Sequence, residues 1–485
     1  MMTIKDLEPK ELWGNFYHLT RCPRPSKHEE IVREFLVNWA KDHKIDCRVD
    51  KVGNVIMTKP ATKGLENLCP VVLQAHMDMV PQARAGKMHD FLKDPIETKI
   101  VDGWVYACDT TLGADNGMGV AAAMAVLESS TIKHGPLEVL ITTDEETGMT
   151  GAFGLKAGEL KGRYLLNLDS ETEGELYVGC AGGIDATLQI PYTTEATPKD
   201  YCAVKLTIGG LKGGHSGMEI NTGRTNANKV LFRMLRWVAE CGIRIISIEG
   251  GNMRNAIPRD AEAVIAMPKA HKECILEEFE KVYNWVKKEI ATVEPDFRYS
   301  VEPVRITRNV MCEADTQKVI NMMMVAPNGV QRMSNDMEDL VETSLNLAIC
   351  KTTPKFFTVK ALIRSSVDTA KDALAERLVC IAEMCGGKCF LNGAYPGWKP
   401  NMQSGLLKSM KETYKRLYNK EPKVMAIHAG LECGLLGGKY PEMEMISFGP
   451  TLNSPHSPDE RVNIESTKYF FEYLVEALAS MPENK

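Results

Sequence analysis

The segment VVLQAHMD, residues 71–78, decides the fold of this 485-residue chain. It begins as an apolar run of strand length and ends in a polar pair, His76 and Asp78. Residues two apart in a strand project from the same face, so both side chains point the same way at the end of the strand. An open α/β sheet binds its ligands just outside the carboxyl ends of its strands.

Further along the chain, other acidic residues and a second histidine also follow predicted strands or begin a predicted helix. Asp115 lies in TTLGADNG, Glu145 and Glu146 follow the apolar run LEVLITT, and Asp169 follows YLLNL. His456, in TLNSPHSPDE, lies in a loop after another predicted strand. Several carboxylates and imidazoles gathered at one sheet edge would repel one another unless cations neutralised them. The pattern therefore predicts a divalent-metal site.

The bulk composition is that of an ordinary globular protein, with 44% hydrophobic and 25% charged residues. The net charge of −6 and the absence of a basic run argue against nucleic acid as a partner. The N-terminal sequence MMTIKDLEPKEL does not resemble a signal peptide, and no apolar stretch approaches the ~20 residues that span a bilayer. The 14 scattered cysteines indicate reduced thiols, so we expect a cytoplasmic protein without a membrane partner.

Two architectures alternate along the chain. Residues 1–186 and 395–485 alternate helices and strands, which predicts an α/β domain with a mostly parallel sheet flanked by helices. Residues 187–394 follow a β-α-β-β-α order and then a looser unit, which predicts an inserted α+β domain, with two halves as an open alternative. The expected helices include 116–129, 226–241, 271–290, 371–385, 403–418 and 465–480. Ser26 to Glu29 fits a capping box before a further helix.

Each candidate also has an ordinary structural interpretation. Asp115 could cap the helix that follows it, and a glutamate pair is usually solvated surface. The expectation of a metal site rests on six residues that all fall at strand ends or helix starts of one sheet: His76, Asp115, Glu145, Glu146, Asp169 and His456. Oxygen and nitrogen ligands without cysteine suit zinc, manganese or cobalt in a hydrolytic site.

Competing catalytic motifs are incomplete. His28 and Glu29 lack the second histidine of an HExxH helix, and Gly214-His215-Ser216-Gly217 does not form a G-x-S-x-G nucleophile elbow. A thiol amidohydrolase stays open as an alternative, with Cys180 or Cys433 as nucleophile and His428 as the only nearby histidine.

Several longer segments carry a family resemblance: LQAHMDMVP, DTTLGADNG, TTDEETGMTGA, NLDSE, GPTLNSPHSPDE, CAGGIDA, LKGGHSGMEI, RNAIPR, GAYPGW and HAGLECGL. Over essentially its whole length the chain resembles the di-zinc aminoacyl-histidine dipeptidases, the carnosinase-like Xaa-His enzymes of the aminoacylase/carboxypeptidase metallopeptidase family. The resemblance implies hydrolysis of dipeptides with two divalent metal ions, zinc before cobalt or manganese. It leaves open a homodimer, another substrate for a related aminopeptidase or amidohydrolase, and a non-catalytic binding protein on the same fold.

The resemblance also implies a ligand set. His76 and Asp169 would bind one ion, Glu146 and His456 would bind the other, and Asp115 would bridge the two.

The remaining roles are implied in the same way. Asp78 would orient His76, and Glu145 would be the general base that takes a proton from the attacking water. The inserted domain would act as a lid whose His215 stabilises the oxyanion. Asn255 and Arg364 would bind substrate, with the Arg364 guanidinium holding the free carboxylate of a dipeptide. The extra acid beside the glutamates, Asp144, could shift the pKa of the base or lie in solvent.

Overall fold

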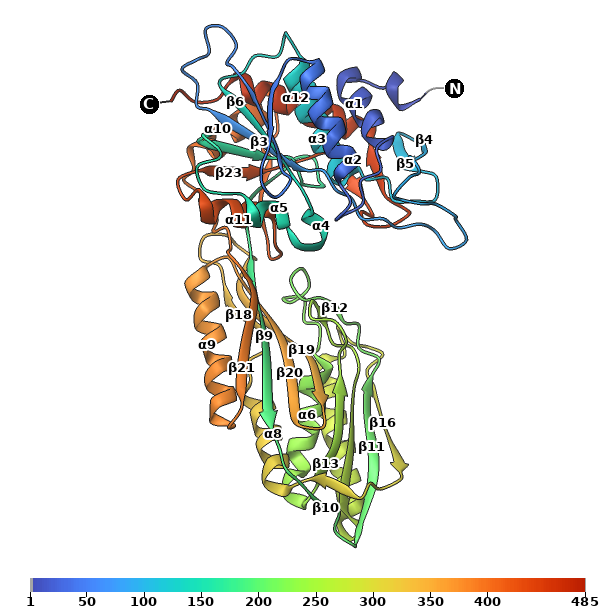
Figure 1. Ribbon diagram of the computed structural model, residues 1–485. Helices are drawn as coiled ribbons and strands as arrows, with labels where there is room; N and C mark the ends of the chain where they lie inside the picture. Colours follow the sequence, from blue (N-terminus) through green and yellow to red (C-terminus); the bar gives the residue numbers. More distant parts are fainter. Residues whose placement is uncertain (1–2, 485) are drawn as a thin grey trace. The chain divides into compact units, whose positions relative to one another are not determined.

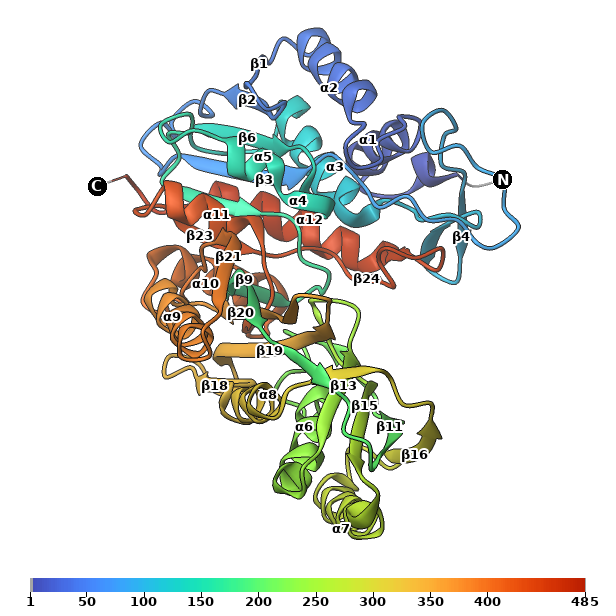
Figure 2. The same ribbon diagram turned by 60° about the horizontal axis from the view of Figure 1, so that its bottom comes forward.

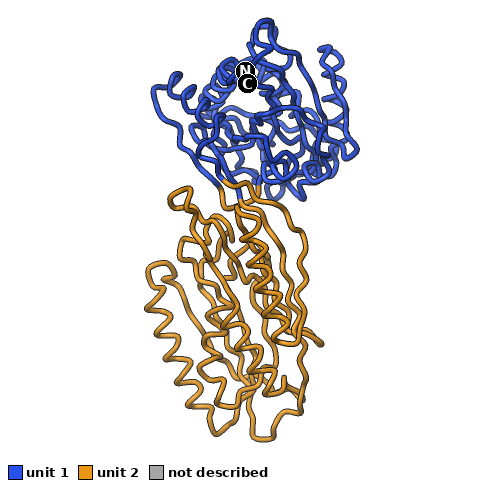
Figure 3. Tube along the Cα trace, turned by 90° about the vertical axis from the view of Figure 1, so that its left-hand side faces the viewer, with its two compact units in different colours: residues 1–180, 400–426, 431–485 blue, residues 181–399, 427–430 orange. Residues whose placement is uncertain are grey.

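The computed structural model describes residues 3–484 and divides into two compact units (Figure 3). Unit 1 contains residues 1–180, 400–426 and 431–485, and unit 2 contains residues 181–399 and 427–430. The boundaries differ from the expected 186 and 395 because strand β9 (Gly182–Pro191) already belongs to the sheet of unit 2. The short return at 427–430 was not expected, since it depends on a long-range contact: the Ala181 N–H lies 3.1 Å from the Ile427 carbonyl oxygen and 2.9 Å from that of Ala429.

Unit 1 is built on an eight-stranded sheet in the order β1-β2-β6-β3-β7-β23-β8-β22. Its strands are β1 (Asp46–Val49), β2 (Val55–Lys59), β3 (Val71–His76), β6 (Leu137–Thr142), β7 (Tyr164–Asn167), β8 (Glu175–Cys180), β22 (Lys423–Ile427) and β23 (Glu444–Ser447). The central strands β6, β3, β7 and β23 are parallel, whereas β1, β2 and β8 pair antiparallel. Figure 1 shows β23, from the C-terminal segment, among strands of the N-terminal segment. The sheet is therefore mixed, and parallel where the predicted residues lie.

Helices pack around this sheet. They are η1 (Ile4–Asp6), α1 (Lys10–Thr20), α2 (Glu30–Asp42), α3 (Ala114–Glu128), α4 (Glu145–Gly148), α5 (Thr150–Gly154), α10 (Gly405–Tyr418), α11 (Glu432–Lys439) and α12 (Ile464–Ala479). The glycine- and alanine-rich α3 is almost wholly buried and packs on β3, because its small side chains permit a close approach. A separate four-stranded sheet contains β4 (Thr98–Val101), β5 (Trp104–Ala107), β24 (Leu452–Asn453) and β25 (Arg461–Asn463). Every helix within residues 3–484 is too short or too polar to span a bilayer.

The expected capping box at the start of α2 is wrong. The helix begins after Glu29 without a side-chain cap. The Ser26 hydroxyl instead donates to the Asp78 carboxylate at 2.7 Å, and the Glu29 carboxylate accepts from the Lys27 N–H at 2.7 Å. The Ser26 hydroxyl therefore bonds a residue just after β3 and does not cap the helix. Local helix signals do not reveal this contact, because its partner is more than 50 residues away.

Unit 2 is built on a nine-stranded sheet in the order β16-β11-β15-β13-β19-β20-β9-β21, with β18 paired to β19. Besides β9, its strands are β11 (Tyr201–Gly209), β13 (Arg244–Gly250), β15 (Ala261–Pro268), β16 (Arg298–Val304), β18 (Gly329–Met333), β19 (Val341–Thr352), β20 (Phe356–Ser365) and β21 (Lys388–Tyr395). Its helices are α6 (Ala227–Val238), η2 (Ala239–Cys241), η3 (Lys269–His271), α7 (Lys272–Ile290), α8 (Glu313–Val325) and α9 (Asp368–Met384). Short ribbons pair β10 (Thr194–Ala196) with β17 (Asn309–Met311), and β12 (Gly214–His215) with β14 (Ala256–Ile257).

The two α+β halves that the sequence left open share one sheet and one core. They meet where β13 pairs with β19, and helix α6 packs against α7, α8, β11 and β15 (Figure 2). One buried cluster contains Phe232 and Phe279 from the first half and Phe357 and Leu378 from the second. Since the same apolar residues serve both halves, unit 2 is a single compact body.

Candidate metal centre

The predicted residues converge at the carboxyl ends of neighbouring parallel strands in unit 1. His76 is the last residue of β3, Glu145 begins α4 just after β6, and Asp169 follows β7. Asp115 comes from the start of α3, and His456 from the loop between β24 and β25. The parallel pairing of β3 with β6 and β7 brings these ends to one edge, as the sequence predicted.

The Asp115 carboxylate lies between two clusters. Its Oδ1 is 3.1 Å from His76 Nε2, and its Oδ2 is 3.1 Å from His456 Nε2. His76 Nε2 is also 3.3 Å from Asp169 Oδ1, and His456 Nε2 is 3.0 Å from Glu146 Oε2. Each oxygen of Asp115 therefore belongs to a different set of three candidate ligand atoms.

These donors fit a pair of metal ions. Ligand atoms ~2.0–2.2 Å from a tetrahedral ion are roughly 3.3–3.6 Å from one another, close to the spacings seen here. Glu146 Oε1 is buried and has no hydrogen-bond partner among residues 3–484, which is costly unless something else satisfies it. The donors are carboxylate oxygens and imidazole nitrogens, a set that suits zinc, manganese or cobalt.

Asp115 does not act as the helix cap that the sequence left as an alternative. Its backbone is non-helical, with φ −81° and ψ 111°, and its carboxylate faces the two histidines. The N–H groups at the start of α3 bond the carboxylate of Glu460 instead. The capping function and the contact with the histidines are thus divided between two acidic residues.

The histidines and carboxylates at the site strongly shift one another's pKa values. Hydrogen bonds to Asp115 and Glu146 raise the pKa of His456 to about 11. Burial opposes a charge on His76, but nearby carboxylates, Asp169 foremost, hold its pKa well above the usual value. Burial also opposes ionisation of Asp115, yet both histidines hold its pKa well below the usual range. Without cations, protons on the histidines balance the carboxylates, so a metal ion would compete with those protons.

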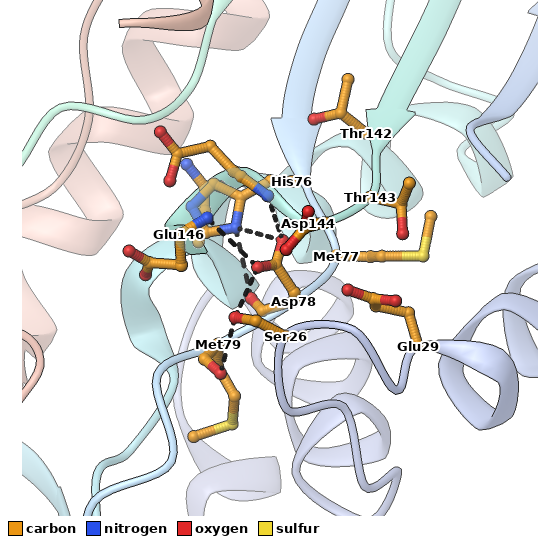
Figure 4. Close-up of polar contacts among 12 residues, drawn as sticks. Ser26, Glu29, His76, Met77, Asp78, Met79, Thr142, Thr143, Asp144 and Glu146 are labelled. Atoms are coloured by element: carbon orange, nitrogen blue, oxygen red, sulfur yellow. Dashed lines mark hydrogen bonds and ion pairs between the residues drawn. The ribbon is translucent and has the colours of Figure 1, made fainter. Parts of the chain in front are cut away.

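Asp78 lies beneath His76 and collects several donors (Figure 4). Its Oδ1 accepts from the Glu145 N–H at 3.0 Å and lies 3.4 Å from His76 Nδ1. Its Oδ2 accepts from the Ser26 hydroxyl at 2.7 Å and from the Glu146 N–H at 3.3 Å. Burial would raise the pKa of Asp78, but the His76 ring and these donors lower it to about 2. One carboxylate thus holds both the His76 ring and the turn that carries the two glutamates.

The two adjacent glutamates have different surroundings. Glu146 lies within ion-pair distance of His456, whereas the Glu145 carboxylate makes none of the hydrogen bonds or ion pairs described for residues 3–484. Burial, and after it the negative charges around it, raise the pKa of Glu145 well above the usual value. A raised pKa makes the ionised carboxylate a stronger proton acceptor, which suits a general base.

Asp144, whose part the sequence left open, belongs to the turn. Its backbone is left-handed, with φ 52°, and its carboxylate accepts from the hydroxyls of Thr147 and Thr150. It is buried and not in solvent. These contacts hold the two short helices α4 and α5 together behind the glutamates.

Next to the candidate ligands lies a group of buried polar side chains that no sequence motif had indicated. Gln74 on β3, Thr142 on β6 and Asn167 on β7 are buried neighbours in the sheet. Glu432 Oε2 accepts from Gln74 Nε2 at 2.6 Å and from the Thr142 hydroxyl at 2.7 Å. A second bond links the side chains of Asn167 and Gln74. Glu432 stands within the quoted segment HAGLECGL, but its contacts are too distant in sequence to predict.

The three predicted substrate-binding residues all lie in unit 2. His215 pairs with Ala256 in the β12–β14 ribbon, next to half-buried Asn255. Arg364 on β20 is buried, donates to the Tyr395 hydroxyl at 3.3 Å, and forms no ion pair with a described carboxylate. A buried guanidinium that lacks an ion pair has the donors to bind an anion.

A further residue, His428, completes this group. Its Nε2 lies 2.7 Å from the Ser344 hydroxyl, and Ser344 is paired with Arg364 across β19 and β20. Burial first, and then the Arg364 charge, lower the pKa of His428 to about 3 and that of His215 below its usual value. Both imidazoles are therefore neutral donors or acceptors beside the guanidinium.

Comparison with known proteins gives this geometry its context. The model of peptidase family M20/M25/M40 matches residues 72–480. The chain belongs to this family. It is 46% identical over 484 residues to the cytosol non-specific dipeptidase of Escherichia coli K12, covering 99% of this chain and 100% of that protein. The crystal structure of the aminoacylhistidine dipeptidase of Vibrio alginolyticus superposes with a TM-score of 0.95 at 46% identity, covering 100% of this chain and 99% of that chain.

The family match and the two near-full-length relatives together confirm three expectations. The resemblance to the aminoacyl-histidine dipeptidases holds along the whole chain, the fold is α/β, and the protein is a hydrolase of peptide bonds. A more distant relative, the acetylornithine deacetylase of Myxococcus xanthus, is 25% identical and covers 71% of this chain and 87% of that protein. The chain is thus also similar, at lower identity, to an enzyme named for deacetylation.

The thiol alternative has no support in the site. Burial raises the pKa of the Cys433 thiol well above its usual value, the opposite of what a nucleophilic cysteine needs. His428, the histidine that the sequence offered as its partner, bonds Ser344.

Proposed function

We propose that this protein hydrolyses dipeptides with two divalent metal ions bound by His76, Asp115, Glu146, Asp169 and His456. One observation carries the proposal: the two oxygens of Asp115 each face a different histidine at 3.1 Å. A carboxylate in this position can bridge two ions while the remaining residues supply each ion with its own ligands. The near-full-length relatives, both named as dipeptidases, support the same assignment.

The chain's own residues account for proton transfer. When bound, the ions lower the pKa of water and polarise the scissile carbonyl. Glu145, whose carboxylate has no other partner among the described residues, accepts the proton of the attacking water and passes it to the leaving amine. Asp78 holds the Glu145 backbone and the His76 ring in place while this occurs.

The inserted unit supplies substrate contacts in this proposal. Arg364 binds the free carboxylate of the dipeptide, because a buried guanidinium without an acidic partner makes two charge-assisted hydrogen bonds to such a group. His215 stabilises the oxyanion and Asn255 contacts the substrate from the same ribbon. Binding of the free C-terminal carboxylate by Arg364 would favour dipeptides over longer chains.

Finer assignments rest on the donors and the relatives. Oxygen and nitrogen donors suit zinc, with cobalt or manganese as substitutes. Xaa-His dipeptides are the proposed substrates, supported by the name of the Vibrio alginolyticus relative, and the cytosol is the proposed location, supported by that of the Escherichia coli relative. A homodimer is compatible with the proposal and is not required by it.

The test separates the base from the ligands. Glu145→Gln keeps the shape and removes the base, so kcat for an Xaa-His dipeptide should fall by ~10²–10⁴ while metal content stays at two ions per chain. Asp144→Asn is the matched control, because Asp144 is next in sequence and its described side-chain hydrogen bonds, to Thr147 and Thr150, lie within its own turn. Loss of metal together with activity in Glu145→Gln would show that the roles of the two glutamates are exchanged.

The same preparation separates the other classes of function. Iodoacetamide should leave activity intact and a chelator should abolish it, whereas a thiol enzyme would respond the other way. A non-catalytic binding protein would hydrolyse no dipeptide, whether it is loaded with zinc, cobalt or manganese.

A further inference from the structure

Two buried charged residues outside the proposed ligand set contact the segment that carries Asp115. Arg24 and Glu460 are each 2% exposed. They come from distant parts of the chain and approach the peptide of Gly113 from its two sides. A buried charge is expensive, so this arrangement requires an explanation beyond packing.

The Glu460 carboxylate accepts four consecutive backbone N–H groups. Its Oε2 accepts from Leu112 at 2.8 Å and from Gly113 at 3.0 Å, and its Oε1 accepts from Ala114 at 2.7 Å and from Asp115 at 3.3 Å. The first N–H groups of a helix have no partner within the helix, and its dipole favours a negative charge there. Glu460 therefore fixes the backbone of Asp115 itself.

Arg24 holds the same segment from the carbonyl side. Its guanidinium donates to the Gly113 carbonyl and, at 3.1 Å each, to the carbonyls of Met77 and Asp78. Gly113 has φ +68°, and a Cβ there would lie 2.6 Å from Arg24 Nη2 and 2.7 Å from Met79 Sδ. Only glycine fits between these groups, so the approach of Arg24 depends on the absence of a side chain.

Arg24 and Glu460 together connect three segments of the chain, which carry His76, Asp115 and His456. Arg24 ties the segment of Asp115 to the residues that directly follow His76. Glu460 ties it to the loop of His456, which lies four residues earlier in the chain. Each oxygen of Asp115 must face one of these histidines, so both ties act on the same geometry.

We propose that Arg24 and Glu460 are positioning residues that hold Asp115 between the two metal ions. The inference rests on the proposed ligand set, in which Asp115 is the bridge. Partners of this kind, which orient metal ligands without touching the ion, typically account for a 10- to 100-fold difference in metal affinity.

Glu460→Gln is the principal variant. The amide keeps the shape but places its NH₂ group against one of the two pairs of N–H donors, those of residues 112 and 113 or those of residues 114 and 115. Glu444→Gln is the matched control, because Glu444, the first residue of β23, also accepts backbone N–H bonds at a helix start: it accepts the Leu406 N–H of α10 at 3.0 Å. Two quantities are measured: the dissociation constants for Co²⁺ by chelator competition, and hydrogen exchange of residues 112–115 in the metal-free protein.

Glu460→Gln should weaken Co²⁺ binding about 10- to 100-fold and speed exchange of residues 112–115 at least ~10-fold, with β3 unchanged. Glu444→Gln should change neither quantity. Faster exchange with wild-type Co²⁺ affinity would overturn the proposal, since the contact would then serve folding alone. Weaker binding with wild-type exchange would also overturn it, since the effect would not pass through the backbone.

If Glu460→Gln does not fold, Arg24→Lys decides by the same two criteria, because it leaves the Glu460 contacts in place and loses the planar fork. The exchange measurement needs no metal. A failure of the ligand set, seen as full metal content in Asp115→Ala, is therefore distinguishable from a failure of the positioning role.

Discussion

Replacing Asp78 by asparagine should weaken metal binding without removing a ligand. The variant keeps the size of the side chain, but one of its two acceptor oxygens becomes an NH₂ donor. With the NH₂ at the place of Oδ1, the Glu145 N–H loses its acceptor, and the His76 ring keeps only the Asp78 carbonyl oxygen, 3.2 Å from its Nδ1. With the NH₂ at the place of Oδ2, the Ser26 hydroxyl can rotate to accept, and only the Glu146 N–H loses its partner.

The orientation with the NH₂ at the place of Oδ2 costs less free energy, so it determines the expected loss of metal affinity. One buried N–H without a partner costs ~1–3 kcal/mol. Removing the negative charge acts in the same direction, because an ionised Asp78 carboxylate beside His76 favours a cation at that ring. The two contributions overlap, so we expect ~2–3 kcal/mol, or about 30- to 150-fold weaker metal binding at ~1.4 kcal/mol per factor of ten.

Competition between the protein and a chromogenic chelator measures this loss directly. Ser26→Ala should cost less than Asp78→Asn, because the remaining donors still satisfy the carboxylate. Asp144→Asn should stay within about threefold of wild type, since hydroxyls can reverse their hydrogen bonds to an amide. Equal affinities for Asp78→Asn and wild type would refute the view that Asp78 holds the site through its donors.

Three other measurements address substrate binding and protons. Arg364→Lys keeps the charge and loses the bidentate fork, so kcat/KM should drop markedly for Xaa-His dipeptides and little for their C-terminal amides; equal losses would exclude a carboxylate site. His215→Ala should lower kcat by ~10²–10³ with little change in KM, and activity recovered on mixing it with Glu145→Gln subunits would mean that His215 acts across a dimer. Metal binding at pH 7 should release at least one proton per chain, because the pKa of His456 is about 11 without metal and a ligating imidazole is neutral. Affinity should therefore rise with pH until that pKa is passed, and calorimetry in buffers of different ionisation enthalpy counts the protons; none released would contradict the assignment of His456.

Local signals in the sequence predict most of the framework. Apolar periodicity places α3, α6, α7, α9, α10 and α12 within a few residues of their observed bounds. The strand preceding His76 is predicted for the same reason, because a buried parallel strand is a short continuous apolar run. Long strands are harder to predict: β9 runs from Gly182 to Pro191, across the domain boundary expected between residues 186 and 187.

The candidate ligands are predictable because parallel strands end at one edge, so residues far apart in sequence must gather there. The residues that hold these ligands in place could not be predicted from the sequence. Arg24 and Glu460 act on Gly113 across 89 and 347 positions, and neither lies at a strand end with a recognisable pattern. Ser26 was misassigned to a capping box because its true partner, Asp78, is 52 positions away.

The central claim is that Asp115 bridges two metal ions, and metal content of Asp115→Ala tests it most directly. The variant is purified, saturated with Zn²⁺, passed through a desalting column and analysed for metal beside the wild-type protein. Because Asp115 supplies one oxygen to each cluster, its removal takes a ligand from both ions. The wild type should retain two equivalents and Asp115→Ala close to none; two equivalents in the variant would contradict the account.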